Sequence, residues 1–211
     1  MNTTFKTLSI AAALAASLGL AGCAANAGSG SSVPMDHGSH GAMSSSMPGA
    51  GSMMPSAGAD HNQADIMFAQ MMIPHHSQAV EMSDIILAKS DVPAEVTALA
   101  TKIKGAQAPE IEQMTGWLSG WGAPTAMSDH SGHGMSGMVD DAGIDKLKSA
   151  TGTEAAKLFL EQMIGHHEGA IDMAQQEIGA GKSPEAVKLG HDIVDAQQAE
   201  ITQMKQLLAT L

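Results

Sequence analysis

Residues 68–82 read FAQMMIPHHSQAVEM, and residues 159–173 read FLEQMIGHHEGAIDM. The two stretches align without a gap at an offset of 91 residues. In each copy Phe, Met, His, Ala and Met follow one another at steps of four, three, four and three, which keeps them on one face of a helix. The pattern predicts two helices whose packed faces carry a His between two Met residues, namely Met72, His75 and Met82 in the first copy and Met163, His166 and Met173 in the second.

Each copy has a second His beside the first. With 3.6 residues per turn, His76 and His167 lie about 100° further round the helix than their neighbours. Pro74 and Gly165, which immediately precede the two pairs, both disfavour a regular helix interior. We expect a local distortion there that aims the imidazoles.

Each copy is followed by a helix with the pattern Q-x-x-E-I-x-x-M. The apolar stripes of these helices are predicted to contain Leu99, Ile103, Ala106, Glu110, Met114 and Trp117 in the first, and Leu189, Ile193, Ala196, Glu200, Met204 and Leu207 in the second. A carboxylate in such a stripe is costly to bury without a cation, a metal or a hydrogen-bond donor. The expected partners of Glu110 and Glu200 are His75 and His166.

The helix boundaries follow from capping and turn residues. The first helix is predicted over 61–89 with Asp60 as its cap, and the second over 93–119. The third opens at a Thr151/Glu154 capping box and ends near 179–181, and the fourth opens at Ser183-Pro184. The sequence predicts an all-α domain over 60–211, a four-helix bundle of a duplicated helical hairpin with hairpins at 60–122 and 151–211 and a Met/His-rich insert at 123–150.

The N-terminal segment is typical of an export signal. Lys6 precedes an apolar run that is too short for a permanent membrane span, and the run ends in Leu20-Ala-Gly-Cys23. This ending resembles the lipobox of bacterial lipoproteins, which implies removal of residues 1–22 and lipidation of Cys23; a secretory signal with a chance Cys is the alternative. We expect an extracytoplasmic protein anchored by lipid to the bacterial cell envelope, on its periplasmic or cell-surface side.

Two further tracts are rich in Met and His. Residues 23–59 are predicted to be a flexible tether, and the insert at 123–150 to be disordered as well. The tract residues expected to capture metal are Met35, His37, His40, Met43, Met127, His130, His133, Met135 and Met138. For the tether, compositional drift is an alternative explanation.

Composition excludes several classes of function. The net charge of −12 argues against nucleic-acid binding and favours a surface that concentrates cations. No nucleophile with its base, phosphate loop or nucleotide fingerprint is present, so we expect no enzyme. Cys23 is the only Cys, which leaves thioether and imidazole as soft metal ligands.

Three interpretations of the His, Met and Glu pattern remain. In the first, the His and Glu side chains pair within a core that Met fills, and the chain is a structural or partner-binding envelope lipoprotein without metal. In the second they form a di-iron carboxylate site of an oxidase, and in the third they bind copper. The motif Glu-x-x-His of di-iron bundles is absent, and Met72-x-x-His75 and Met163-x-x-His166 stand in its place. Thioethers favour copper, particularly Cu(I), over iron. Silver would bind similarly, and zinc or nickel would suit the His-only parts.

The paired pattern F-x-x-x-M-x-x-H-H-x-x-A-[VI]-x-M, followed each time by Q-x-x-E-I-x-x-M, resembles the bacterial domain of unknown function 305. That family is regarded as ferritin-like, and some of its members have been linked to copper binding. The resemblance covers about 62–211 and implies an exported bundle concerned with metal handling. It places the family motif on Met72, His75, His76, Met82, Met163, His166, His167 and Met173.

The sequence thus predicts an envelope protein that buffers or delivers copper, as Cu(I), Cu(II) or both. Its partners would be the metal ion, the membrane through Cys23 and a protein to which copper is transferred. Glu110 and Glu200 would be either ligands or outer partners that fix the tautomer of a ligating His. The oligomeric state is open.

Overall fold

The computed structural model describes residues 60–126 and 135–211, and over these it contains five helices and no strand. The helices are α1 (Gln63–Leu87), α2 (Ala94–Gly120), α3 (Asp141–Ser149), α4 (Gly152–Ala180) and α5 (Pro184–Leu208). The predicted signal peptide, Cys23, the tether with its Met and His residues, and Met127, His130 and His133 lie outside the described residues. The predicted all-helical class is confirmed.

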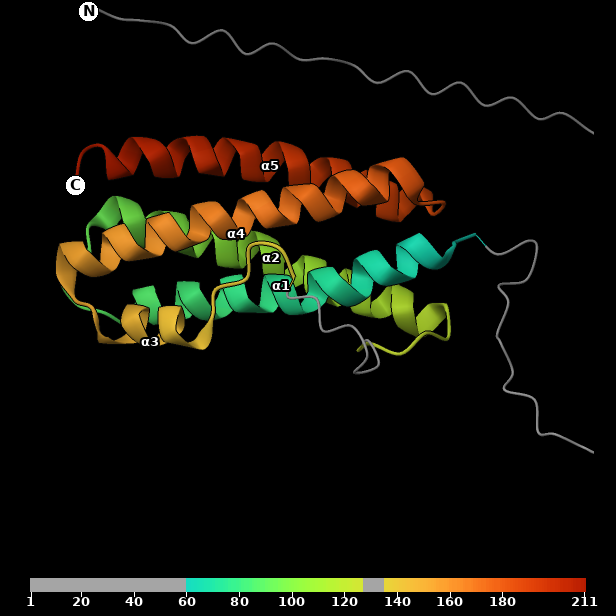
Figure 1. Cartoon of the computed structure of the whole chain (residues 1–211), viewed down its shortest axis with the longest axis horizontal. Coiled ribbons are helices and arrows are strands. Elements are labelled where there is room, and N and C mark those ends of the chain that lie inside the picture. The colour runs from blue at the N-terminus through green and yellow to red at the C-terminus, as the bar shows by residue number, and fades with distance from the viewer. Residues whose placement is uncertain (1–59, 127–134) are drawn as a thin grey trace, which may run out of the picture. The chain divides into compact units, whose positions relative to one another are not determined.

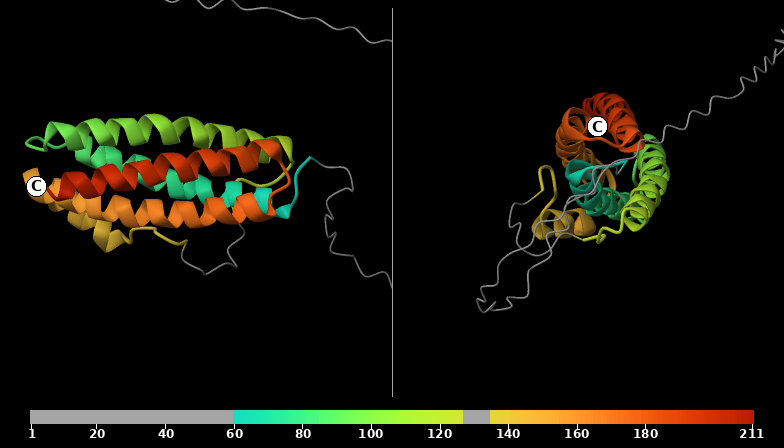
Figure 2. Two further views of the ribbon diagram at one scale, coloured as in Figure 1. Left: turned by 90° about the horizontal axis from the view of Figure 1, so that it is seen from above. Right: turned by 90° about the vertical axis from the view of Figure 1, so that its right-hand side faces the viewer.

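The four long helices lie side by side as two hairpins (Figures 1 and 2). Short connections join α1 to α2 and α4 to α5, so the two helices of each hairpin run antiparallel. Helix α1 also packs against α4, whereas α2 and α5 touch only slightly. The two helices that carry the His pairs therefore form the central contact of the described domain.

Two of the three predicted helix caps differ from the structure. Helix α1 is capped by Asn62 and not by Asp60: the Asn62 side chain accepts from the backbone N–H of Ala64 and Asp65, and Asp65 accepts in return from the Asn62 N–H. Thr151 makes no capping hydrogen bond, so the predicted capping box is wrong. Gly152, the first residue of α4, has φ +54°, and the chain enters the helix from another direction. Ser183 caps α5 with Pro184 at the first position, as predicted.

The insert between the hairpins is partly ordered, which corrects the prediction of disorder over 123–150. Asp140 caps α3 by accepting from the Gly143 N–H at 2.7 Å. Ile144 and Leu147 are buried against the core, and Gln162 of α4 donates to the Gly143 carbonyl at 2.9 Å. Two buried apolar side chains and this hydrogen bond hold the short helix against the rest of the described domain.

The core stripes of α2 and α5 are also partly different from those predicted. Ala106 and Ala196 are exposed, and Gln107 and Gln197 are buried in their place. At the end of α2, Leu118 enters the core, while Trp117 stacks on Trp121 with ring centroids 5.9 Å apart. Strict alternation of steps of three and four drifts from 3.6 residues per turn over a long helix, which explains these one-residue errors.

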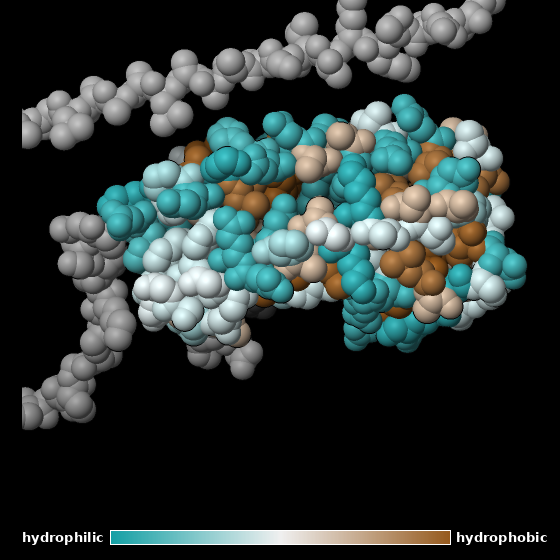
Figure 3. Space-filling model, turned by 180° about the vertical axis from the view of Figure 1, so that it is seen from behind, coloured by the Kyte–Doolittle hydropathy of each residue, from teal (hydrophilic) through white to brown (hydrophobic). Residues whose placement is uncertain are grey.

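Most large apolar side chains of the described domain are at least partly buried. Among the described residues Met67 is the one large hydrophobic side chain that is exposed, at 41%. From behind, hydrophilic and hydrophobic residues are interspersed over the surface (Figure 3). In the described part of the chain no helix is both long enough and apolar enough to cross a membrane.

A buried carboxylate pair joins the start of α1 to the α4–α5 connection. Asp65 accepts from the backbone N–H of Lys182 at 3.0 Å and of Ser183 at 2.9 Å. Burial would raise the pKa of Asp65, but hydrogen bonds from Glu177 and from these backbone groups lower it. Burial, and then the hydrogen bond and charge of Asp65, raise the pKa of Glu177 to about 8. Glu177 therefore holds a proton near neutral pH beside the ionised Asp65 carboxylate.

Candidate metal centre

The central contact between α1 and α4 is made by one His from each copy of the repeat. The rings of His75 and His166 lie with centroids 3.7 Å apart and planes tilted by 36°. Both side chains are buried, at 0% and 1% exposure. The repeated face of each helix thus points into a shared interior, as the sequence predicted.

The second His of each copy forms a pair with a Glu of the same hairpin. His76 Nε2 lies 2.7 Å from Glu110 Oε2, and His167 Nε2 lies 2.9 Å from Glu200 Oε2. The prediction that these carboxylates pair with His75 and His166 is wrong. The 100° step between neighbouring His residues turns His76 and His167 toward the partner helix of their own hairpin, and turns His75 and His166 toward each other.

Three of the four His rings have an oxygen acceptor at Nε2. Besides the two Glu carboxylates, the Ser136 carbonyl lies 3.2 Å from His75 Nε2. Carbonyl and carboxylate oxygens only accept, so Nε2 must carry the proton in each of these contacts. The Nδ1 atoms of all four rings are buried without a hydrogen-bond partner, and His166 lacks a partner at Nε2 as well. In a neutral ring with a proton on Nε2, Nδ1 is the lone pair that a metal would use.

Burial keeps the rings of His75, His166 and His167 neutral. It lowers the pKa of His75 to about 3, helped by the neighbouring His76 and opposed by the Ser136 carbonyl. Burial, followed by the charges of His75 and His167, lowers the pKa of His166 to about 2. The nearby His75 backbone opposes this shift, although neither ring nitrogen of His166 makes a hydrogen bond. Burial also lowers the pKa of His167, against the pull of Glu200. Neutral imidazole is the form that binds metal.

The carboxylates of the two hairpins differ in exposure. Burial would raise the pKa of Glu200, but the hydrogen bond and charge of His167, together with Lys102 at 3.3 Å, lower it. The Glu200 side chain is 5% exposed and that of Glu110 is 23% exposed. Both carboxylates are engaged by the His76 and His167 rings, which fits the role of outer partners.

The six thioethers predicted on the helix stripes are all buried, at 5% exposure or less, and they divide between the two apolar clusters of the core. Met72, Met114 and Met173 belong to one cluster, and Met82, Met163 and Met204 to the other. Each cluster combines two Met residues of one hairpin with one from the other hairpin. The sequence predicted the six residues but not this division.

Nitrogen and oxygen ligands alone do not make a closed site. Over the described ranges, no three His, Cys, Asp or Glu side chains are placed so that they could hold one ion. A soft ion would therefore need thioethers beside imidazole nitrogen, and this donor set suits Cu(I) or Ag(I) better than iron. The residues present fit copper by their chemistry.

Three polar groups in or beside the core were not predicted as part of the site. Gln107 and Gln197 are buried, and Gln107 has no hydrogen-bond partner at either amide atom. The Ser136 carbonyl reaches His75 from the insert, which only coordinates reveal. A signal for the two Gln residues was present in the repeated Q-x-x-E pattern, where they occupy matching positions.

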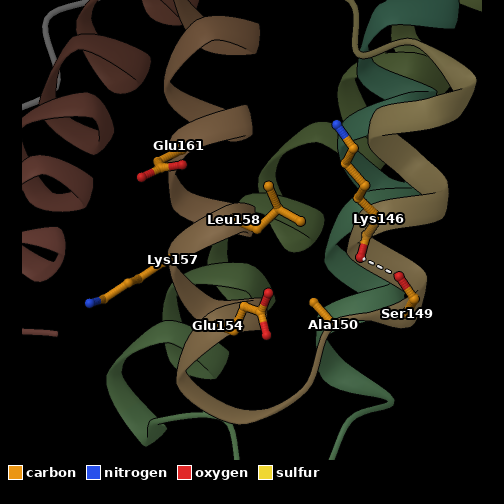
Figure 4. Close-up of a pocket in the computed structure, with 7 residues that line it drawn as sticks. All are labelled: Lys146, Ser149, Ala150, Glu154, Lys157, Leu158 and Glu161. Carbon is orange, nitrogen blue, oxygen red and sulfur yellow. Dashed lines mark hydrogen bonds between the residues drawn. The ribbon is translucent and has the colours of Figure 1, made fainter.

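A surface cleft of about 380 Å³ lies elsewhere, between α3 and α4 (Figure 4). Its lining residues are Lys146, Ser149, Ala150, Glu154, Lys157, Leu158 and Glu161. None of them belongs to the predicted Met, His and Glu set, and the lining lacks soft ligands. The cleft is not part of the candidate metal centre.

Comparison with known proteins identifies the family of the chain. Residues 65–208 match the family model "Domain of unknown function (DUF305)". A crystal structure from Streptomyces coelicolor, of a DUF305 protein named as a candidate secreted protein, is 38% identical over 70% of this chain and 93% of its own, with a TM-score of 0.66. A DUF305 fragment from Deinococcus radiodurans is 32% identical over 71% and 98%, with a TM-score of 0.65.

The protein CopM is a third similar structure. Its Cu(II)-bound form is 36% identical over 69% of this chain and 96% of CopM, with a TM-score of 0.60. CopM has also been solved with Cu(I) and with silver bound. No curated protein matches the sequence. The family match spans well over half of the chain, and the protein therefore belongs to the DUF305 family.

Proposed function

We propose that this protein binds copper outside the cytoplasm and buffers it or delivers it to a partner protein. The observation that carries the proposal is the buried layer of four His rings, each with an unpartnered Nδ1, between two clusters that each hold three Met residues. Unpaired buried nitrogens cost stability in the metal-free protein. A bound soft ion would satisfy them.

The relatives support the same ion class. CopM, solved with Cu(I), Cu(II) and silver, is at least 33% identical to this chain in each of those forms. Thioether favours Cu(I), and imidazole serves both oxidation states of copper. We propose that the buried layer is the selective site, with Met135, Met138 and the tract residues outside the described ranges as weaker capture groups.

The proposal also includes the location of the protein and its anchoring to the membrane. Residues 1–22 would be a lipoprotein signal and Cys23 the lipidated residue, after which a tether would connect a ferritin-like four-helix bundle to the envelope. Mass spectrometry of the protein from a bacterial envelope checks this, since a mature chain that begins with diacylated Cys23 is expected. We also propose that the protein acts without catalysis. A di-iron oxidase needs carboxylates that are free to bind iron, whereas Glu110 and Glu200 are paired with His76 and His167.

The deciding experiment is an anaerobic Cu(I) titration of the purified full chain against a chromophoric chelator. The double variant H75A/H166A is expected to lose the tightest binding event. His191→Ala, at an exposed position on α5, is the matched control and should bind as the wild type does. The Met/His tracts are identical in all three proteins, so the difference reports the buried layer. Equal binding by the double variant and the control would contradict the proposal, and so would retention of iron with oxygen consumption.

A further inference from the structure

A short segment of the insert, Met135–Val139, crosses α4 at the level of the His layer, and we call it the strap. A Cβ atom added to Gly169 of α4 would overlap the Ser136 carbonyl and lie 2.8 Å from the Gly137 Cα. Gly137 has φ +81°, and a Cβ atom there would lie 2.7 Å from the Gly165 carbonyl. The strap and α4 therefore pack backbone against backbone, which only glycine permits at these positions.

The strap is also fastened to α1. The Gln78 side chain donates to the Val139 carbonyl at 2.8 Å and accepts from the Val139 N–H at 2.8 Å. One turn away, His75 Nε2 donates to the Ser136 carbonyl at 3.2 Å. A single stretch of main chain thus bridges the two helices that carry His75 and His166.

The two copies of the repeat differ where the strap lies. Gln78 in the first copy corresponds to Gly169 in the second, and Pro74 corresponds to Gly165. Gln78 supplies the hydrogen bonds to the strap, and Gly169 supplies the room for it. Positions 78 and 169 are variable positions of the repeat, and a strap that packs on one side of the two helices accounts for the difference between Gln78 and Gly169.

The Ser136 residue is exposed, yet its carbonyl contacts the fully buried ring of His75. On this side the exposed Ser136 lies directly against the His75 ring. We infer that the strap is a positioning element of the metal centre: the Ser136 carbonyl keeps the proton of His75 on Nε2, and an ion reaches the His75–His166 layer by displacing the strap. The part of this inference that concerns ion entry rests on the proposed function, whereas the part that concerns the His75 proton does not.

Gly169→Ala is the variant that tests the strap without changing a candidate ligand. The added methyl group collides with Ser136, so the strap must leave α4. Gly165→Ala is the matched control, because it lies one turn away on the same helix and its added Cβ atom meets nothing within 4 Å. Both substitutions favour the helix itself.

Two measurements on these variants decide the inference. In the metal-free protein, the side-chain ¹⁵N shifts of His75 report which ring nitrogen is protonated, and Gly169→Ala should reduce the Nε2–H form while the control keeps it. In the Cu(I)-loaded full chain, a chelator should withdraw copper about 5- to 30-fold faster from Gly169→Ala than from the control, as expected for the loss of one or two hydrogen bonds. Circular dichroism verifies that each variant is folded.

The outcomes separate the two ideas. If the wild type binds no copper, the proposed function fails, while the ¹⁵N shifts still decide whether the strap positions His75. If the wild type binds copper and Gly169→Ala matches Gly165→Ala in both measurements, the strap inference alone is overturned. Should Gly169→Ala fail to fold, Gln78→Ala removes both hydrogen bonds to Val139 and is judged by the same two criteria.

Discussion

The rings of His75 and His166 lie with their centroids 3.7 Å apart and their planes tilted by 36°, although 91 positions separate the two residues in the sequence. They are corresponding residues of the two repeat copies, so each helix contributes the same chemistry to this contact. Neither ring nitrogen of His166 is hydrogen bonded. The described domain thus has an energetically unfavourable polar group at the contact between α1 and α4.

Replacing His166 by Leu should stabilise the metal-free protein. The change removes two unpartnered buried nitrogens, each worth about 1 to 3 kcal/mol, and gives up a ring contact of about 0.5 to 1.5 kcal/mol. We expect the free energy of unfolding in urea to rise by about 0.5 to 5 kcal/mol, and the stabilisation on adding Cu(I) to disappear. His167→Leu is the control, because it breaks the pair with Glu200 and should destabilise. A metal-free His166→Leu protein weaker than the wild type would refute this.

The two His–Glu pairs should differ in strength. Truncation of Glu200 leaves the His167 proton without an acceptor in a fully buried place, whereas Glu110 is more exposed and water replaces it more easily. Glu200→Ala should cost about 2 to 3 kcal/mol and Glu110→Ala about 1 kcal/mol. Urea unfolding at neutral pH measures both. Equal losses, or a larger loss at Glu110, would show that exposure does not control the pairs.

Thioether and imidazole contributions can be separated by isosteric substitution. Met→Leu costs less than about 1.5 kcal/mol at each site because volume is conserved. The triple variant M72L/M114L/M173L should therefore fold, bind Cu(I) at least about tenfold more weakly and change little toward Cu(II). The triple variant M82L/M163L/M204L tests the other cluster, and Met67→Leu is the exposed control. If both triple variants keep the Cu(I) affinity of the control, the buried sulfurs are not ligands.

The stability of the metal-free protein should have a maximum near pH 6.5. Below that value the unfolded chain protonates His75, His166 and His167, whose pKa values are lowered in the fold, so stability falls as the pH drops toward about 3. Below pH 6.5 the unfolded chain binds up to three more protons at these His residues than the folded protein does, whereas the folded protein binds only one more at Glu177. The effect of the His residues on stability is therefore the larger one. Urea unfolding measured between pH 4 and 9 checks the position of the maximum.

Above pH 6.5 the slope should change sign because of Glu177. Its pKa is raised to about 8 in the fold, so the folded protein holds a proton that the unfolded chain has lost. Stability should fall by up to about 1.4 kcal/mol per pH unit until about pH 8 and then level off. Glu177→Gln should flatten this limb, and Glu161→Gln, exposed on the same helix, should not. An unchanged limb in Glu177→Gln would assign the loss to another group.

Much of the helical pattern could be predicted because a buried helix face has a strict period. The repeat brought out His75, His166 and all six buried Met residues, and Ser183-Pro184 marked the start of α5 correctly. Pairing of the carboxylates was missed, since a stripe shows which residues face inward but not which neighbour each one meets.

Features that break the repeat were the ones that sequence analysis missed. Asp65 and Glu177 correspond to Ala156 and Ile86, so comparison of the copies gave no reason to pair them. The strap depends on main-chain atoms of Ser136 and Val139, which any residue type carries. Such contacts arise from tertiary packing and leave only indirect traces, as at Gly169.

The duplication of the hairpin has a consequence for assembly. A lone hairpin would have to meet a second copy of itself to bring two such rings together, and its pairing would then vary with protein concentration. Joining both halves in one polypeptide makes that encounter intramolecular, even in a dilute compartment. It also releases the halves from being identical, so that one could gain Gln78 while the other gained Gly169.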